Sequence, residues 1–189
     1  MKAGASIIVG ISGASGAIYG VELLKALKDA GVETHLVISR NAQITLAHET
    51  PYSLPQVHAL ATHVHSAQDM AAPISSGSCK TLGMIVAPCS MRSVAEIATG
   101  VTTTLLTRAA DVVLKERRKL VLMARETPLN AVHLRNMLSV TEMGGIICPP
   151  VPAFYSKPQS IEDMVAHSVG RVLDLFQIEH ELVARWEGM

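Results

Sequence analysis

Aromatic residues and excess charge are both scarce in this 189-residue chain. Phe, Trp and Tyr make up 3% of it, and 16 Lys and Arg balance 16 Asp and Glu. Nucleic-acid-binding surfaces depend on positive charge and on aromatic rings that stack on bases. The composition therefore predicts no nucleic-acid partner.

Long apolar runs and paired cysteines are also missing. No uninterrupted apolar run is long enough to cross a bilayer, and the first residues lack the apolar segment of a signal peptide. Cys79, Cys89 and Cys148 are scattered, which favours reduced thiols over disulfides or a structural metal site. His63 and His65, the only close histidine pair, fit alternation along an exposed segment better than a metal site. We expect a cytoplasmic protein that contains no metal and does not span a membrane.

Apolar residues, in contrast, are abundant. They make up 49% of the chain, against 17% charged residues. We interpret this surplus as contacts between subunits of a homo-oligomer, although a core rich in Ala and Val explains it nearly as well. The length fits a single domain that spans residues 1–189.

Short β-branched runs alternate with helical patterns along the chain. The expected strands are 6–11, 32–38, 84–87, 120–124 and 146–148. The expected helices are 17–30, 41–49, one through 94–97, 105–115, 132–142 and a C-terminal helix at about 160–182. The segment 51–78 is less regular. This alternation predicts an α/β fold, a Rossmann-like or flavodoxin-like doubly wound parallel sheet.

The loop after the first expected strand is rich in Gly and Ser and leads directly into a helix. Free N–H groups and the helix dipole at such a point favour a phosphate. No Lys follows Gly16, which excludes the loop of nucleoside triphosphatases. Ser12 replaces a glycine of the dinucleotide motif, and the second strand ends in Ser39-Arg40 without an acidic residue. The sequence favours a mononucleotide or another small phosphate over NAD, although such a loop is about as often a plain turn.

Polar residues follow the expected strands, so they should gather at the carboxyl edge of the sheet, where ligands bind in such folds. Glu126 is the best candidate for a general acid or base, and a surface ion pair with Arg125 is the alternative. Cys89 is either a nucleophile or, more in keeping with its place at a strand end, a buried thiol. The Asp-Asp-x-x-Asp pattern that holds magnesium in diphosphate-using prenyltransferases is absent.

Seven blocks of the sequence, in order and covering nearly the whole chain, resemble the UbiX family of flavin prenyltransferases. They are Ser12-Gly-Ala-Ser-Gly16, Ser75-Ser-Gly-Ser78, Pro88-Cys-Ser90, Arg108-Ala-Ala-Asp-Val-Val-Leu-Lys-Glu116, Arg125-Glu-Thr-Pro-Leu129, His133-Leu-Arg-Asn-Met137 and Pro150-Val-Pro-Ala-Phe-Tyr155.

The resemblance implies a Rossmann-like homo-oligomer, typically a dodecamer, that binds FMN. It also implies transfer of a dimethylallyl group from dimethylallyl monophosphate to N5 and C6 of reduced FMN, without a metal. The product, prenylated FMN, is the cofactor of UbiD-type decarboxylases. Two alternatives remain: a non-catalytic FMN-carrying accessory subunit of an aromatic acid decarboxylase, and an FMN-dependent cysteine decarboxylase. The FMN-dependent cysteine decarboxylases carry a Pro-x-Met-Asn motif, whereas this chain has Pro88-Cys-Ser-Met-Arg92.

The resemblance also assigns roles to individual positions. Glu126 would relay protons, and Ser15 would assist in catalysis. The positions that would bind FMN are Gly13, Ala14, Ser15, Ser39, Ser90, Met91, Arg92, Ser93 and Arg125. Those that would bind the allylic phosphate or line its site are Tyr155, Arg171, Lys115, Glu49 and Trp186. The segment Thr102-Thr-Thr104 departs from the Asp-Asn or Asn-Asn that members usually carry, which leaves the geometry of that loop open.

Overall fold

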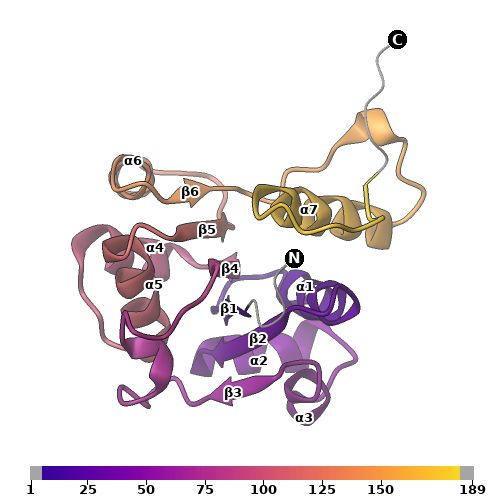
Figure 1. Ribbon diagram of the computed structural model, residues 1–189. Helices are drawn as coiled ribbons and strands as arrows, with labels where there is room; N and C mark the ends of the chain where they lie inside the picture. The colour runs from indigo at the N-terminus through magenta and orange to yellow at the C-terminus, as the bar shows by residue number, and fades with distance from the viewer. Residues whose placement is uncertain (1–5, 184–189) are drawn as a thin grey trace.

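Six parallel strands form one sheet through the centre of the molecule in the computed structural model, which describes residues 6–183 (Figure 1). The strands are β1 (Ser6–Ile11), β2 (Glu33–Ile38), β3 (His63–His65), β4 (Gly83–Cys89), β5 (Lys119–Ala124) and β6 (Ile146–Ile147). Their order in the sheet is β3-β2-β1-β4-β5-β6, and every neighbouring pair is parallel. This is the strand order of a Rossmann fold, which confirms the predicted doubly wound architecture.

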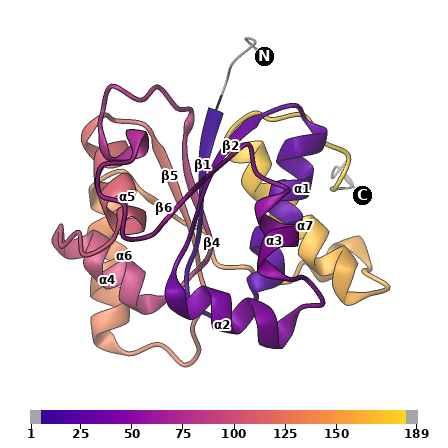
Figure 2. The same ribbon diagram turned by 90° about the horizontal axis from the view of Figure 1, so that it is seen from below.

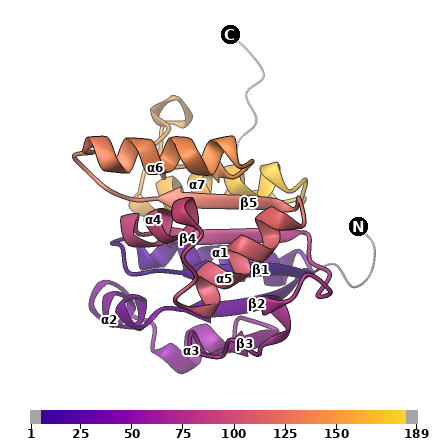
Figure 3. The ribbon, with the colours of Figure 1, turned by 90° about the vertical axis from the view of Figure 1, so that its left-hand side faces the viewer.

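Helices cover both faces of the sheet. They are α1 (Ala17–Asp29), α2 (Arg40–Glu49), α3 (Leu54–His58), α4 (Met91–Thr99), α5 (Leu105–Lys115), α6 (Ala131–Glu142) and α7 (Ile161–Leu175). Two short 3-10 turns are η1 (Pro73–Ser75) and η2 (Phe154–Ser156). Figure 2 shows α1, α3 and α7 on one face and α4, α5 and α6 on the other. In Figure 3, α4 and α5 lie in front of the sheet and α1 behind it.

The core consists of two apolar layers, one on each face of the sheet. Ile7, Val9 and Ile11 of β1 pack in the layer beneath α1 and α7, whereas Ile8 packs in the layer beneath α4 and α5. All six residues of β1 are buried. Burial on both faces explains why the strands appear in the sequence as continuous apolar runs rather than alternating patterns.

The structure adds detail to one expectation about regular elements and corrects another. The segment 51–78 contains α3, β3 and η1. The C-terminal helix ends at Leu175 rather than at residue 182. Gln177 adopts a left-handed conformation with φ 56°, and the Ile178 N–H donates to the carbonyl of Leu173 at 3.2 Å. This turn buries the Ile178 side chain, which is 2% exposed, and so redirects the chain.

Neither a membrane-spanning helix nor a metal cluster is found within residues 6–183. No helix there combines the length and the apolar character needed to cross a bilayer. In the same part of the chain, no group of three or more His, Cys, Asp or Glu side chains is arranged to hold a metal ion.

Three imidazole rings cluster at the edge of the sheet. Nδ1 of His35 on β2 lies 3.0 Å from Nε2 of His65 on β3, a hydrogen bond in which one neutral ring donates and the other accepts. The His35 and His63 ring centroids are 4.7 Å apart. Burial, reinforced by repulsion from His63 and His65 when these are charged, lowers the pKa of His35 to about 4.

We expect acid to destabilise the fold partly through His35. Because its folded-state pKa lies below the unfolded value of about 6.5, the unfolded chain takes up this proton first as the pH falls. The stabilisation is complete above about pH 6.5 and is lost as the pH approaches about 4. When the pH is lowered from about 7 to about 4.5, the Tm of His35→Phe should therefore fall by less than the Tm of the parent. His48→Gln, at an exposed position on α2, is the control, and an equal loss of Tm in His35→Phe would contradict the prediction.

Candidate functional site

The loops that follow β1 and β4 are joined at the carboxyl edge of the sheet. Ser12 is 2% exposed, and its Oγ donates to the carbonyl of Pro88 at 3.1 Å and accepts from the Ser90 N–H at 2.7 Å. From β1 the chain continues to β2 on one side, and from β4 it continues to β5 on the other. This is the topological switch point, where open parallel sheets form their ligand crevice.

Two helix N-termini lie at this crevice. Ser39 caps α2 by accepting from the Ala42 N–H at 3.2 Å, and Ser90 caps α4 by accepting from the Ser93 N–H at 3.3 Å. Both caps line a cavity of about 420 Å³. Other residues that line it include Gly13, Arg40, Asn41, Arg92 and Ser93. Helix N-termini, hydroxyl groups and arginines together provide donors and positive potential for an anion.

Gly13 is required by the close approach of the first loop to α2. A Cβ atom at this position would lie 2.5 Å from Cβ of Asn41. Any side chain at residue 13 would therefore push the loop away from α2 and change the shape of the cavity that both segments line.

The N-terminus of α1, where the sequence favoured a phosphate, has a carboxylate as its partner. Oε2 of Glu49 accepts from the Gly16 N–H at 2.7 Å and from the Ala17 N–H at 3.2 Å. Partial burial acts to raise the pKa of Glu49, but hydrogen bonds from Ser15 and these two amides outweigh it and lower the pKa. Among the helix N-termini at this crevice, those of α2 and α4 therefore remain available to an anion.

Arg125 and Glu126 follow β5 at the carboxyl edge of the sheet. The Arg125 N–H donates to the carbonyl of Cys89 at 3.0 Å, which ties the ends of β5 and β4 together. The positive charge of Arg125 acts to lower the pKa of Glu49. Glu126 is exposed, and its Oε1 accepts from the Thr127 N–H at 2.9 Å. Within the described residues no ion pair joins Arg125 and Glu126. The role of Glu126 in proton transfer stays a prediction.

Cys89 is a buried thiol at the end of β4. Burial raises its pKa far above the ordinary value, and its hydrogen bond with Ser12 only partly opposes this. Because the thiolate is the nucleophilic form, the structure favours the interpretation as a buried thiol over that as a nucleophile.

Tyr155 and Arg171 lie on a second surface, formed by η2 and α7. The Tyr155 hydroxyl is 3.1 Å from Nε2 of His167. His167 and Arg171 are four residues apart on α7 and so share one face of that helix. Arg171 donates to Oδ2 of Asp174 at 2.9 Å. Tyr155 is therefore connected to the Arg171 face of α7 through His167.

Helix α7 is linked in turn to the rim through Tyr19 of α1. Burial raises the pKa of Tyr19, while a hydrogen bond with Ser168 of α7 and the charge of Arg125 act against that rise. The Tyr155–Arg171 surface thus adjoins the cluster of Ser15, Glu49 and Arg125.

Lys115 is the one predicted site residue that the described fold places away from this rim. It ends α5, whose first turn lines the cavity through Leu106 and Thr107. Lys115 lies eight residues beyond Thr107, which is about 12 Å further along the helix axis at 1.5 Å per residue. There it pairs with Oε1 of Glu116 at 2.5 Å, near the amino end of β5. Trp186 lies outside the described residues.

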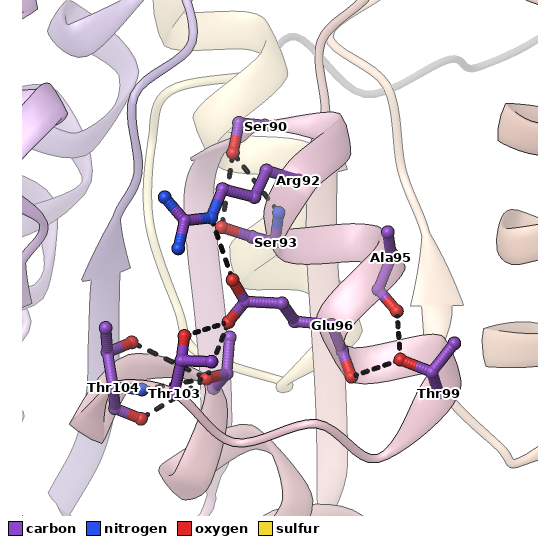
Figure 4. A network of polar contacts seen from close by, with 9 residues as sticks. Ser90, Arg92, Ser93, Ala95, Glu96, Thr99, Thr103 and Thr104 are labelled. Atoms are coloured by element: carbon purple, nitrogen blue, oxygen red, sulfur yellow. Dashed lines mark hydrogen bonds and ion pairs between the residues drawn. The ribbon is translucent and has the colours of Figure 1, made fainter.

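The sequence analysis did not predict the polar network on the cavity wall. Glu96 of α4 accepts hydrogen bonds from Arg92, Thr103 and Thr107, which places the unusual threonine segment against α4 (Figure 4). The spacing of Arg92 and Glu96, four residues apart on a helix, was the one available signal.

Comparison with known proteins confirms the resemblance to the UbiX family. Residues 1–173 match the family model described as Flavoprotein. A probable UbiX-like flavin prenyltransferase of Bacillus subtilis is 60% identical over 183 residues, which cover 97% of this chain and 90% of that protein.

Two solved structures agree closely with this fold. A crystal structure of the UbiX protein PadA1, in complex with FMN and dimethylallyl pyrophosphate, matches with a TM-score of 0.97 and 54% identity, over 98% of this chain and 99% of that one. A dodecameric FMN-dependent UbiX-like decarboxylase from Escherichia coli O157:H7 matches with a TM-score of 0.95 and 54% identity, over 97% and 100% of the two chains. The chain therefore belongs to the flavoprotein family and, within it, to the UbiX-type flavin prenyltransferases.

Proposed function

We propose that this protein transfers a dimethylallyl group from dimethylallyl monophosphate to N5 and C6 of reduced FMN, and so produces prenylated FMN for a UbiD-type decarboxylase. The proposal depends on one observation: a chain of this family has, at its switch point, a cavity lined by two helix N-termini and two arginines. We infer that the whole chain acts as one FMN-binding domain. Its three unpaired cysteines favour the reducing cytoplasm as its location.

FMN would bind at the switch point. The N-termini of α2 and α4 would donate hydrogen bonds to its phosphate, and Arg40 and Arg92 would supply positive charge. The remaining FMN contacts come from the residues assigned by position, which are Gly13, Ala14, Ser15, Ser39, Ser90, Met91, Ser93 and Arg125. Gly13 fits this role because the loop can approach α2 closely only without a side chain.

Reduced FMN, when bound, supplies the electron-rich ring to which the allylic carbon becomes attached. The chain stabilises the phosphate that leaves with the electron pair of the broken C–O bond, through Tyr155, Arg171 and Lys115. Glu49 and Ser15 hold the loop before α1 in place through their mutual hydrogen bond. Glu126, exposed at the rim, accepts and returns the protons that ring closure exchanges.

Lys115 can bind the allylic phosphate only at the site of a neighbouring copy of the chain. In its own chain, α5 places it at the amino edge of the sheet, opposite the edge where the cavity lies. Helix α6 supports association between copies. Its side chains Val132, Leu134 and Leu138 are 57%, 54% and 58% exposed, and apolar exposure on this scale is typical of an interface. We propose a homo-oligomer, and a dodecamer like the E. coli relative is the expected size.

Anaerobic incubation with reduced FMN and dimethylallyl monophosphate tests the proposed function. A flavin heavier by one dimethylallyl unit, identified by mass spectrometry, is the expected result. A parallel reaction with the diphosphate identifies the preferred donor. Tightly bound but unmodified flavin in both reactions would contradict catalysis and favour an FMN-carrying accessory subunit of an aromatic acid decarboxylase.

Arg171→Ala should raise KM for the allylic phosphate by about tenfold or more and leave the affinity for FMN nearly unchanged. The reason is that Arg171 lies on the α7 surface with Tyr155 and His167, apart from the α2 and α4 N-termini. Lys28→Ala removes a cation from the opposite end of α1 and is the control. An unchanged KM for the donor would remove Arg171 from the phosphate site.

A further inference from the structure

Glu96 is a carboxylate fixed at three points on the wall of the switch-point cavity. Its Oε1 accepts from Nε of Arg92 at 2.8 Å. Its Oε2 accepts from Oγ1 of Thr103 at 2.7 Å and from Oγ1 of Thr107 at 3.2 Å. Partial burial acts against ionisation, but these hydrogen bonds outweigh it and lower the pKa of Glu96. The group is therefore an anion at neutral pH, beside a cavity suited to another anion.

Arg92 is held differently. Its side chain is 72% exposed, whereas that of Glu96 is 14% exposed. Only Nε bonds to Glu96, and within residues 6–183 the two terminal nitrogens have no hydrogen-bond partner. In Figure 4 the dashed line to Glu96 starts from Nε, and no dashed line reaches either terminal nitrogen. An exposed arginine ordinarily samples many rotamers, and fixing it costs entropy. Here the carboxylate is already fixed by two threonines, so its bond to Nε restricts the guanidinium.

We propose that Glu96 is a positioning residue that holds Arg92 so that its two terminal nitrogens face the phosphate of bound FMN. The inference rests on the proposed binding of FMN at the switch point. Both residues line the same cavity. Glu96 helps binding through Arg92 and, without Arg92, repels the phosphate.

The unusual threonine segment belongs to this arrangement. Thr103, from the threonine segment 102–104, donates to Oε2 of Glu96 at 2.7 Å. An aspartate at residue 103 would place a second carboxylate within hydrogen-bond distance of Glu96, and two like charges so close repel each other. An uncharged donor at residue 103, here the Thr103 hydroxyl, therefore allows Glu96 to act as the anchor of Arg92.

The test compares FMN with riboflavin, which lacks the phosphate, in four proteins: the parent, Arg92→Ala, Glu96→Ala and the double variant. Glu96→Ala should weaken FMN binding about fivefold, which corresponds to about 1 kcal/mol, and leave riboflavin binding unchanged. Arg92→Ala should weaken FMN binding further. The double variant should bind FMN at least as tightly as Arg92→Ala, since removing Glu96 then removes only repulsion.

Substitutions at the threonines separate positioning from a merely structural effect. Thr103→Val should lower the FMN-to-riboflavin affinity ratio as Glu96→Ala does, and Thr103→Ser should restore it. Thr99→Val is the matched control, because Oγ1 of Thr99 donates to backbone carbonyls of Ala95 and Glu96 rather than to the carboxylate.

Four results would overturn the inference. They are unchanged or tighter FMN binding by Glu96→Ala, an equal loss for FMN and riboflavin, additive losses in the double variant, and a parent protein that does not prefer FMN to riboflavin. If the parent makes prenylated FMN but Glu96→Ala binds FMN normally, the positioning role fails while the proposed function stands.

Discussion

Glu126→Gln is expected to bind FMN normally and to lose turnover by about 10²- to 10⁴-fold, the usual contribution of general acid–base catalysis. Glutamine keeps the size of the side chain and can still accept the Thr127 N–H bond that Oε1 of Glu126 accepts at 2.9 Å. It cannot take up and return a proton. The substitution therefore removes the proposed chemistry while it preserves the local structure at the end of β5.

Single-turnover reactions analysed by mass spectrometry would measure this effect. We expect flavin that has received the dimethylallyl group but has not completed ring closure. Glu33→Gln is the control, because Glu33 is an exposed acid at the beginning of β2, on the opposite edge of the sheet. Product formation at the parent rate by Glu126→Gln would contradict the proton role.

Local patterns were sufficient to predict most of the fold. The strand 6–11 and the helix 105–115 have the predicted bounds. These elements were predictable because a strand buried on both faces is continuously apolar and a half-buried helix alternates with a period near 3.6 residues. Strand β3 was not predicted, because its three residues at the sheet edge are mostly exposed and Val64 is the only apolar one among them.

The polar contacts of the site could not be predicted, because they join residues that are distant in the sequence. Ser12 bonds to Ser90 across 78 residues, and Glu49 bonds to Gly16 across 33. The Gly/Ser loop correctly indicated a helix with free N–H groups. It did not indicate that a carboxylate from α2 would occupy two of them. Such pairings are set by the register of the parallel strands, which no local pattern encodes.

The position of Lys115 leads to a prediction about whether one active site is built from a single chain or from two. The described fold places Lys115 at the amino end of β5 and Glu126 just beyond the carboxyl end of the same strand. One chain therefore cannot bring both to one substrate. We expect Lys115→Ala to bind FMN and to lose at least about 10²-fold in activity, because the leaving phosphate loses a cation from a neighbouring copy.

Mixed oligomers test this arrangement directly. Lys115→Ala and Glu126→Gln chains, each nearly inactive alone, should recover about a quarter of the parent activity when they assemble at random in equal amounts, since each site draws the two residues from different chains. Arg125→Ala mixed with Glu126→Gln is the control, because these neighbouring residues always come from the same chain and no intact site forms. If the first mixture recovers no activity, Lys115 does not act across a subunit boundary. Normal activity of Lys115→Ala alone would remove it from the site.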